Sequence, residues 1–313
     1  MINCKNGIVG FVVGDAMGVP VEFCIRERLM QNPLTEMIGY GSHDVPKGSW
    51  SDDSSMTLAT IDAIIEDKEV KPETIARNFL YWFRDAKYTP TDRVFDIGRT
   101  CLKAIARYES KVDKAEECGG KGEMDNGNGS LMRILPIAYY CYAKNMTEKE
   151  IYNIVKSVSS ITHGHEISIM ACFIYVLFAI RLLYGDKLEQ AYSKIKETHY
   201  NGYFDKDTIV RFDRILKNDI SKYDLNTISS NGFVLDTLEA TLWVLFNTDT
   251  YNQAIIGAIN LGNDTDTVGA CVGGLAGIYY GFDEINVLWI KDILKYDYII
   301  ELCKKFDGVL NNE

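Results

Sequence analysis

Two short acidic clusters are the residues of this sequence most able to do chemistry. Asp52 and Asp53 are adjacent in GSWSDDSSMTLATIDAI, and Asp264 and Asp266 are separated by one threonine in LGNDTDTVGACVGGLAGIYYG. Each cluster is followed by an apolar stretch with helical spacing, so we expect the acids to stand at the start of a helix. Carboxylate oxygens are the ligands that Mg²⁺ and Mn²⁺ prefer, which makes both clusters candidate metal ligands.

The spacing of these acids leaves two interpretations open. An aspartate at a helix start can accept the free backbone N–H groups, and this capping role explains either cluster taken alone. Neighbouring side chains on a helix diverge by about 100°, so adjacent acids converge only where the chain is still entering the helix. If the two helix starts meet, the four aspartates and the hydroxyls of Ser51 and Thr267 form a site for two divalent cations, Mg²⁺ or Mn²⁺.

The elements that would position these acids are helices. Apolar residues recur at spacings of three and four in the segments 54–66, 72–86, 93–108 and 233–246. No segment shows a convincing strand alternation. Loop-like breaks fall near residues 32–50, 109–130 and 199–206. We therefore predict an all-α fold, with a single compact multi-helix domain over residues 1–313.

Glycines recur every four residues in two of the expected helices, at Gly10, Gly14 and Gly18 and at Gly269, Gly273, Gly277 and Gly281. Glycine inside a helix costs about 1 kcal/mol relative to alanine, so such stripes indicate close approach of two backbones. Tight packing without chemistry is a sufficient explanation. It would also hold the start of the second helix rigidly.

Composition narrows the possible partners and compartments. A net charge of −11 argues against nonspecific binding to nucleic acid or to an anionic membrane. The apolar run 167–180 is too short to cross a bilayer core of roughly 30 Å, so we expect a buried central helix there. No secretory leader is recognisable, and the eight cysteines form no CxxC pair. We expect a cytoplasmic protein with reduced thiols and no Cys/His zinc site.

Six segments resemble, in order, those of the ADP-ribosylglycohydrolase family: GFVVGDAMGVPVEF, GSWSDDSSMTLA, VFDIGRT, NGNGSLMRILPIA, ITHGH and LGNDTDTVGACVGGLAGIYYG. The resemblance spans residues 7–281 and is nearest to the dinitrogenase reductase-activating glycohydrolase branch. It implies a compact α-helical domain with two Mg²⁺ or Mn²⁺ ions in a central cleft. It also implies hydrolysis of the glycosidic bond between ADP-ribose and a modified side chain.

The resemblance assigns roles to individual residues. The implied metal ligands are Ser51, Asp52, Asp53, Asp264, Asp266 and Thr267. The family more often has threonine where Ser51 stands, but serine offers the same hydroxyl. Glu22 matches an acid/base or gating residue, and Asp96 an aspartate with a proton-transfer role. On sequence alone, Glu22 reads equally as an exposed residue after a turn, and Asp96 as a polar position on an amphipathic helix.

A substrate-binding set follows from the same resemblance. Asn128, Gly129 and Ser130 would contact ADP-ribose in a loop whose backbone N–H groups can bind an anion, while a plain Asn-Gly turn is the alternative. Arg133 is expected to brace this loop or to reach an acid. His163 matches a substrate-lining histidine, although a lone histidine is more often a core residue. His165 is less well matched, because Glu166 stands where the family frequently has proline.

The sequence thus predicts a metal-dependent hydrolase that removes ADP-ribose from a protein, with arginine as the expected linkage. Ribose hydroxyls would be held at the cations, and positive charge would develop at the anomeric carbon. The expected partners are an ADP-ribosylated protein and ADP-ribose, with no nucleic acid or membrane, and the chain is expected to be a monomer. The alternatives are a non-catalytic ADP-ribose-binding, nucleotide-binding or crystallin-like structural member, and a two-metal phosphohydrolase.

Overall fold

Helices α1 (Lys5–Gly18) and α14 (Thr265–Tyr280) pack face to face through their glycines. The structure is a computed structural model that describes residues 1–111 and 113–312. A Cβ atom on Gly14 would lie 2.0 Å from the carbonyl oxygen of Gly269, and one on Gly18 would lie 2.4 Å from Cα of Asp266. Larger residues at these positions would separate the helices, so the predicted close approach is confirmed. Gly281 plays a different part, since it ends α14 with a φ of 93°.

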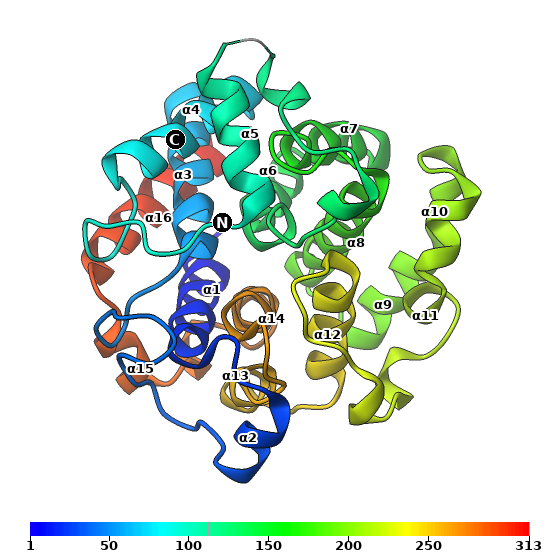
Figure 1. The fold of residues 1–313 in the computed structure, drawn as a ribbon. Helices are drawn as coiled ribbons and strands as arrows, with labels where there is room; N and C mark the ends of the chain where they lie inside the picture. The colour runs from blue at the N-terminus through cyan, green and yellow to red at the C-terminus, as the bar shows by residue number, and fades with distance from the viewer. Residues whose placement is uncertain (112, 313) are drawn as a thin grey trace.

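Helices account for all the regular structure of the described residues, which confirms the all-α prediction. Besides two isolated bridges, these residues form no strand. α14 lies near the centre of Figure 1 and contacts α1, α8, α12 and α13. The other helices are α2 (Arg26–Gln31), α3 (Asp52–Asp67), α4 (Pro72–Asp85), α5 (Arg99–Glu109), α6 (Leu135–Ala143), α7 (Glu148–Ser159), α8 (Glu166–Leu183), α9 (Leu188–Glu197), α10 (Lys206–Arg211), α11 (Asp213–Leu216), α12 (Val234–Phe246), α13 (Tyr251–Ile259), α15 (Val287–Asp292) and α16 (Tyr296–Leu310).

Helix α8 is the apolar helix predicted from the run 167–180. It has 18 residues and a mean hydropathy of 2.1, which by length and composition alone would suffice to cross a membrane. Within the protein, however, 78% of it is buried, mainly against α6, α7, α9 and α12. The predicted buried helix is therefore confirmed, but the prediction from its length is wrong, because α8 extends the apolar run by one residue at its start and three at its end.

The prediction of a helix over 93–108 is wrong for its first six residues. Residues 93–98 are not helical, and α5 begins only at Arg99, after Gly98 in an extended conformation. The guanidinium of Arg93 donates a hydrogen bond to the carbonyl oxygen of Asp44, 2.8 Å away, which ties this segment to the loop before α3. Asp96 therefore lies on a non-helical segment and not on an amphipathic helix.

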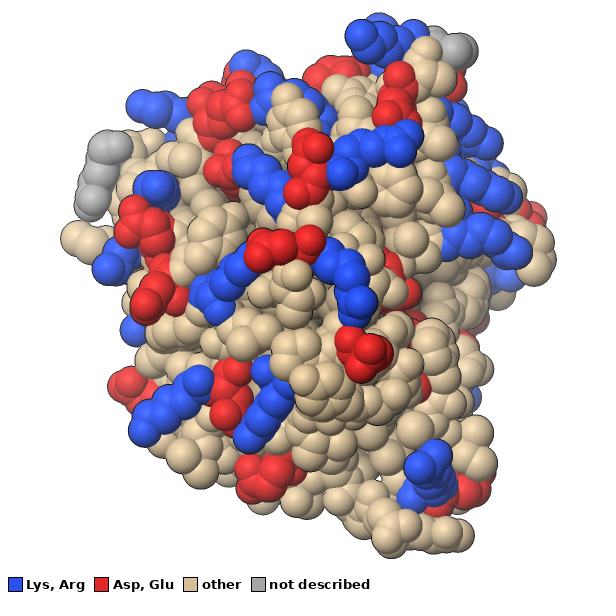
Figure 2. Space-filling view, turned by 60° about the vertical axis from the view of Figure 1, so that its left-hand side comes forward, with Lys and Arg blue, Asp and Glu red and all other residues tan. Residues whose placement is uncertain are grey.

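Acidic and basic side chains are mixed on the surface. Figure 2 shows both signs interspersed over one face, with no large area of a single sign among the residues described there. Many of the basic residues are paired, as in Arg84 with Glu109 and Arg77 with Glu66, both at 2.5 Å. This face therefore offers no continuous basic surface to a phosphate backbone.

Candidate active site

The starts of α3 and α14 meet at a single point. The hydroxyl of Thr267 lies 3.4 Å from Oδ2 of Asp53, and the hydroxyl of Ser51 lies 3.1 Å from the same oxygen. Asp266 is fixed on the same side, because Gly18 of α1 leaves room for its backbone. The two clusters that are far apart in the sequence are thus adjacent in the fold.

Capping does not explain the aspartates of α3. The N-cap of this helix is Ser51, whose hydroxyl oxygen accepts from the backbone N–H of Asp53. Asp15, in the last turn of α1, accepts the backbone N–H groups of Ser51 and Ser54 at 2.9 and 3.0 Å. These contacts satisfy the helix start, and the carboxylates of Asp52 and Asp53 remain available for another role.

The four aspartates are buried and repel one another. Burial raises the pKa of Asp52, Asp53, Asp264 and Asp266, and nearby carboxylates raise it further. For Asp264 this rise is offset in part because Asn128 donates a hydrogen bond to its Oδ2, 2.7 Å away. Such a group of acids is unfavourable unless protons or cations neutralise it.

The surroundings of one carboxylate oxygen, Oδ1 of Asp53, indicate whether a cation fits between the two helix starts. Oδ1 of Asp53 is buried and has no hydrogen-bond partner among the described residues. An unpartnered buried carboxylate oxygen is costly, and a metal ion would satisfy it. The donors around it are carboxylate and hydroxyl oxygens, which suit Mg²⁺ or Mn²⁺. The residues present therefore fit the expected ions.

A cleft of about 380 Å³ opens beside the aspartates. Nine of the twelve predicted site residues line it: Glu22, Asp52, Asp53, Asp96, Asn128, Gly129, His163, Asp264 and Thr267. Ser51 and Asp266 lie just behind it in the same helix starts. The volume is in the range of small-molecule sites.

Glu22 lines the cleft next to the aspartates. It follows the short turn Val19–Val21 at the end of α1, and its carboxylate lies within 4.8 Å of ligand atoms of Asp264 and Asp266. Burial raises its pKa to about 7. Asp96 approaches from the opposite side on the segment before α5, so two acids face the same space.

The Asn128 loop is held mainly by contacts within the protein. The Asn128 amide donates to Oδ2 of Asp264 and to the hydroxyl of Thr237, which fixes Asp264 in place. The hydroxyl of Ser130 points into the core, toward Ser159 and Cys172, and the Ser130 side chain does not line the cleft. Gly129 has room for no side chain, since a Cβ there would lie 2.8 Å from Cε1 of His163.

His163 is a neutral imidazole at the wall of the cleft. Burial, with a contribution from Arg133, lowers its pKa to about 3. The Thr162 hydroxyl oxygen accepts from Arg133 at 2.7 Å and lies 2.9 Å from Nδ1 of His163. Arginine can only donate, so this chain favours donation from Thr162 to Nδ1 and leaves the proton on Nε2. Arg133 thus braces the Asn128 loop, which is one of the two roles predicted for it; the other was contact with an acid.

His165 belongs to the helix and not to the cleft. Its Nδ1 accepts from the backbone N–H of Ile167 as the N-cap of α8, and its Nε2 lies 3.4 Å from Glu123.

Two residues next to the site, Asp15 and His43, were not predicted from the sequence. Asp15 was visible as a lone charge in an apolar helix. His43 carried no signal, because it lies in an irregular loop and reaches Glu22, which is 21 positions away, only in the fold.

Comparisons with known proteins point to one family. A sequence model of a family described as ADP-ribosylglycohydrolase matches residues 3–313. An ADP-ribosylarginine hydrolase, Tri1, from Serratia proteamaculans is 29% identical over 96% of this chain and 78% of its own length. An ADP-ribosyl-[dinitrogen reductase] glycohydrolase from Rhodospirillum rubrum is 27% identical over 92% of this chain and 89% of its own. A solved structure of an ADP-ribosylglycohydrolase-related protein complex covers 98% of both chains with a TM-score of 0.81 and 24% identity, and so shares the fold.

Proposed function

Since the chain belongs to the ADP-ribosylglycohydrolase family, we propose that it is a metal-dependent hydrolase that releases ADP-ribose from modified arginine side chains of a protein. The observation that carries the proposal is the convergence of two acidic helix starts around the unpartnered Oδ1 of Asp53. The residues that would hold two divalent cations are Ser51, Asp52, Asp53, Asp264, Asp266 and Thr267. Mg²⁺ or Mn²⁺ bound there would neutralise the carboxylates, hold ribose hydroxyls and polarise a water molecule.

Glu22 and Asp96 are the groups that move protons. In hydrolysis the C–N bond to the leaving guanidine breaks, a water oxygen bonds to the anomeric carbon, and the leaving nitrogen takes up a proton. Burial keeps a protonated form of Glu22 available near neutral pH, because its pKa lies at about 7. Asp96 faces it across the cleft and accepts the proton that the water loses.

The remaining residues hold the substrate. The protonated Nε2 of His163 is suited to donate to an acceptor on ADP-ribose, and the bare backbone at Gly129 lets a substrate approach closely. Asn128 acts through Asp264, whose carboxylate it orients. Ser130 is given no substrate contact, because the residue is fully buried, does not line the cleft and points its hydroxyl into the core.

The arginine linkage is supported by the names of two relatives of different organisms, both described as ADP-ribosylarginine hydrolases. The relative that acts on dinitrogen reductase is nearly as similar, so identity alone does not select a protein substrate.

The decisive experiment measures products from arginine-linked and serine-linked ADP-ribosyl proteins, with Mg²⁺ or Mn²⁺ and with a chelator. We expect free ADP-ribose from the arginine-linked substrate, and no release with chelator. Release from the serine-linked substrate alone would overturn the linkage. No product would favour a binding protein, and AMP or phosphate would favour a phosphohydrolase.

A further inference from the structure

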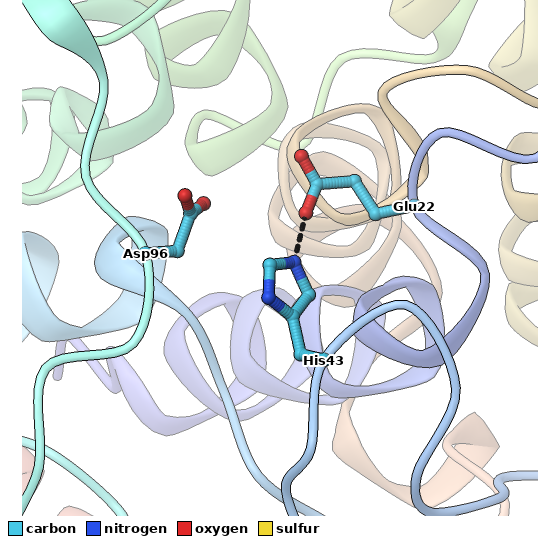
Figure 3. A group of neighbouring side chains, drawn as sticks. All are labelled: Glu22, His43 and Asp96. Atoms are coloured by element: carbon cyan, nitrogen blue, oxygen red, sulfur yellow. Dashed lines mark hydrogen bonds and ion pairs between the residues drawn. The ribbon is translucent and has the colours of Figure 1, made fainter.

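Among the residues described in the structure, His43 is the one hydrogen-bond partner of the Glu22 carboxylate. An ionised carboxylate can only accept, so Nε2–H of His43 donates. Nε2 of His43 lies 2.5 Å from Oε2 of Glu22. Figure 3 shows the imidazole pointing at one oxygen of Glu22, while the other oxygen is directed away from it. Asp96 extends toward the same space, and ligand atoms of all three side chains lie within 4.8 Å of one another.

The loop that carries His43 is fastened to the turn that carries Glu22. The hydroxyl of Ser42 donates to the backbone carbonyl of Glu22, and the backbone N–H of Ser42 donates to that of Pro20 at 2.9 Å. Gly41 allows this contact, since a Cβ there would lie 2.1 Å from the Pro20 carbonyl oxygen. The loop therefore holds both the backbone and the side chain of Glu22.

The His43 ring is itself held in place. Its centroid lies 5.2 Å from that of Phe95 and 6.1 Å from that of Phe23, with interplanar angles of 54° and 55°. Only 13% of the His43 side chain is exposed. Two tilted aromatic contacts restrict the ring to an orientation in which Nε2 faces Glu22.

We propose that His43 is a positioning residue, which holds the Glu22 carboxylate by one oxygen and leaves the other free to exchange a proton with the substrate. The inference rests on the proposed function, in which Glu22 moves a proton. A glutamate side chain has three rotatable bonds, and the nearby Asp264 and Asp266 repel its charged form. Without the His43 donor, the carboxylate leaves the productive position.

The test compares variants that keep or remove the donor. His43→Gln retains an N–H near the position of Nε2, whereas His43→Phe retains ring packing with Phe23 and Phe95 but cannot donate. We expect His43→Phe to lower kcat by about 10- to 100-fold, with KM and ADP-ribose affinity within about twofold of wild type. His43→Gln should recover most of that loss. His43→Leu is a second donor-less variant, should the phenylalanine disturb folding.

A double variant separates positioning from a merely structural effect. If His43 acts through Glu22, adding His43→Phe to Glu22→Gln should lower kcat no further. Equal losses in His43→Phe and His43→Gln, a further loss in the double variant, or full activity of His43→Phe would each overturn the proposal.

A crystal structure of His43→Phe gives a readout that does not depend on activity. We expect the Glu22 carboxylate to have left its position beside Asp264, and a carboxylate in the same position would overturn the inference. If the wild type releases no ADP-ribose, the proposed function fails, and this structure still decides whether His43 positions Glu22.

Discussion

The carboxylate of Asp15 accepts the backbone N–H of Ser51, 2.9 Å away, so a side chain from the last turn of α1 caps the first turn of α3. The same carboxylate also accepts from the backbone N–H and the hydroxyl of Ser54. Through this contact, the first helix of the chain fixes the segment that carries Asp52 and Asp53. The proposed metal site therefore depends on a residue that is not itself one of the proposed ligands.

Asp15→Asn is expected to destabilise the protein by about 1–3 kcal/mol, because an amide N–H₂ would face backbone donors in place of an acceptor. Urea unfolding measures the change, and calorimetric titration with Mn²⁺ should show weaker binding. Asp85→Asn, at the exposed end of α4, is the control and should leave both unchanged. An Asp15→Asn protein as stable as wild type would contradict the capping role.

Asp266→Ala is expected to abolish ADP-ribose release, since it removes one of the proposed ligands. In the absence of metal the variant should be as stable as wild type or more so, because it relieves repulsion among buried carboxylates. Melting temperatures with and without Mg²⁺ or Mn²⁺ test this: an ion that binds only the folded state raises the wild-type value. A wild type that gains nothing from either ion would count against a metal site.

Glu22→Gln is expected to lower kcat by about 10²- to 10⁴-fold, the usual contribution of a general acid or base. ADP-ribose affinity and metal binding should change little, because the amide keeps the shape of the side chain. Steady-state kinetics and calorimetry separate the two effects. A variant with wild-type turnover would remove Glu22 from the mechanism and leave Asp96 as the next residue to test.

The metal-free protein is expected to lose stability as pH rises from about 4 to about 7. Burial raises the pKa of Glu22 to about 7 and that of Asp15 to about 6, and it also raises the pKa of the four aspartates. In this window the folded state therefore binds more protons than the unfolded state, so the free energy of unfolding falls with pH. His163, whose pKa burial lowers to about 3, acts in the opposite sense below pH 6.5 and offsets part of this fall.

Urea unfolding in chelator at pH 5 and pH 7.5 measures this dependence. Saturating Mg²⁺ or Mn²⁺ should flatten it, because the ions replace the protons. Stability that rises between the two pH values in chelator would show that the acids are not held close together in the folded protein.

Gly14→Ala is expected to lower the free energy of unfolding by about 1–3 kcal/mol or more, because its Cβ would lie 2.0 Å from the Gly269 carbonyl oxygen. Gly308→Ala in α16 is the matched control, since nothing lies within 4 Å of a Cβ there. It should be neutral or stabilising by about 0.4–1 kcal/mol. Equal effects of the two substitutions would mean that α1 and α14 do not pack as described.

Sequence periodicity predicted the helices well where the chain itself carries the pattern. The apolar spacing of 233–246 gave α12, and Pro72 marks the first turn of α4. Residues 93–98 have the same spacing but no helix. Nothing local in the sequence signals that this segment crosses to Asp44, so tertiary contact overrode the pattern there.

The residues of the candidate site likewise fall into those that the sequence could predict and those that it could not. The acidic clusters could be recognised because each stands directly before an apolar helix. The direction of the Ser130 hydroxyl and the part played by His43 could not, because both are set by partners distant in the chain: Ser159 and Cys172 in the first case, Glu22 in the second.

The contact between Thr267 and Asp53 joins residues 214 positions apart, which has a consequence for biosynthesis. At ~5–20 residues per second, α14 leaves the ribosome roughly 10 to 40 s after α3. A chain that stops before Asp264 carries Ser51, Asp52 and Asp53 without the other three proposed ligands, and the glycine face of α1 without α14. The proposed site therefore cannot be complete before synthesis has passed residue 267.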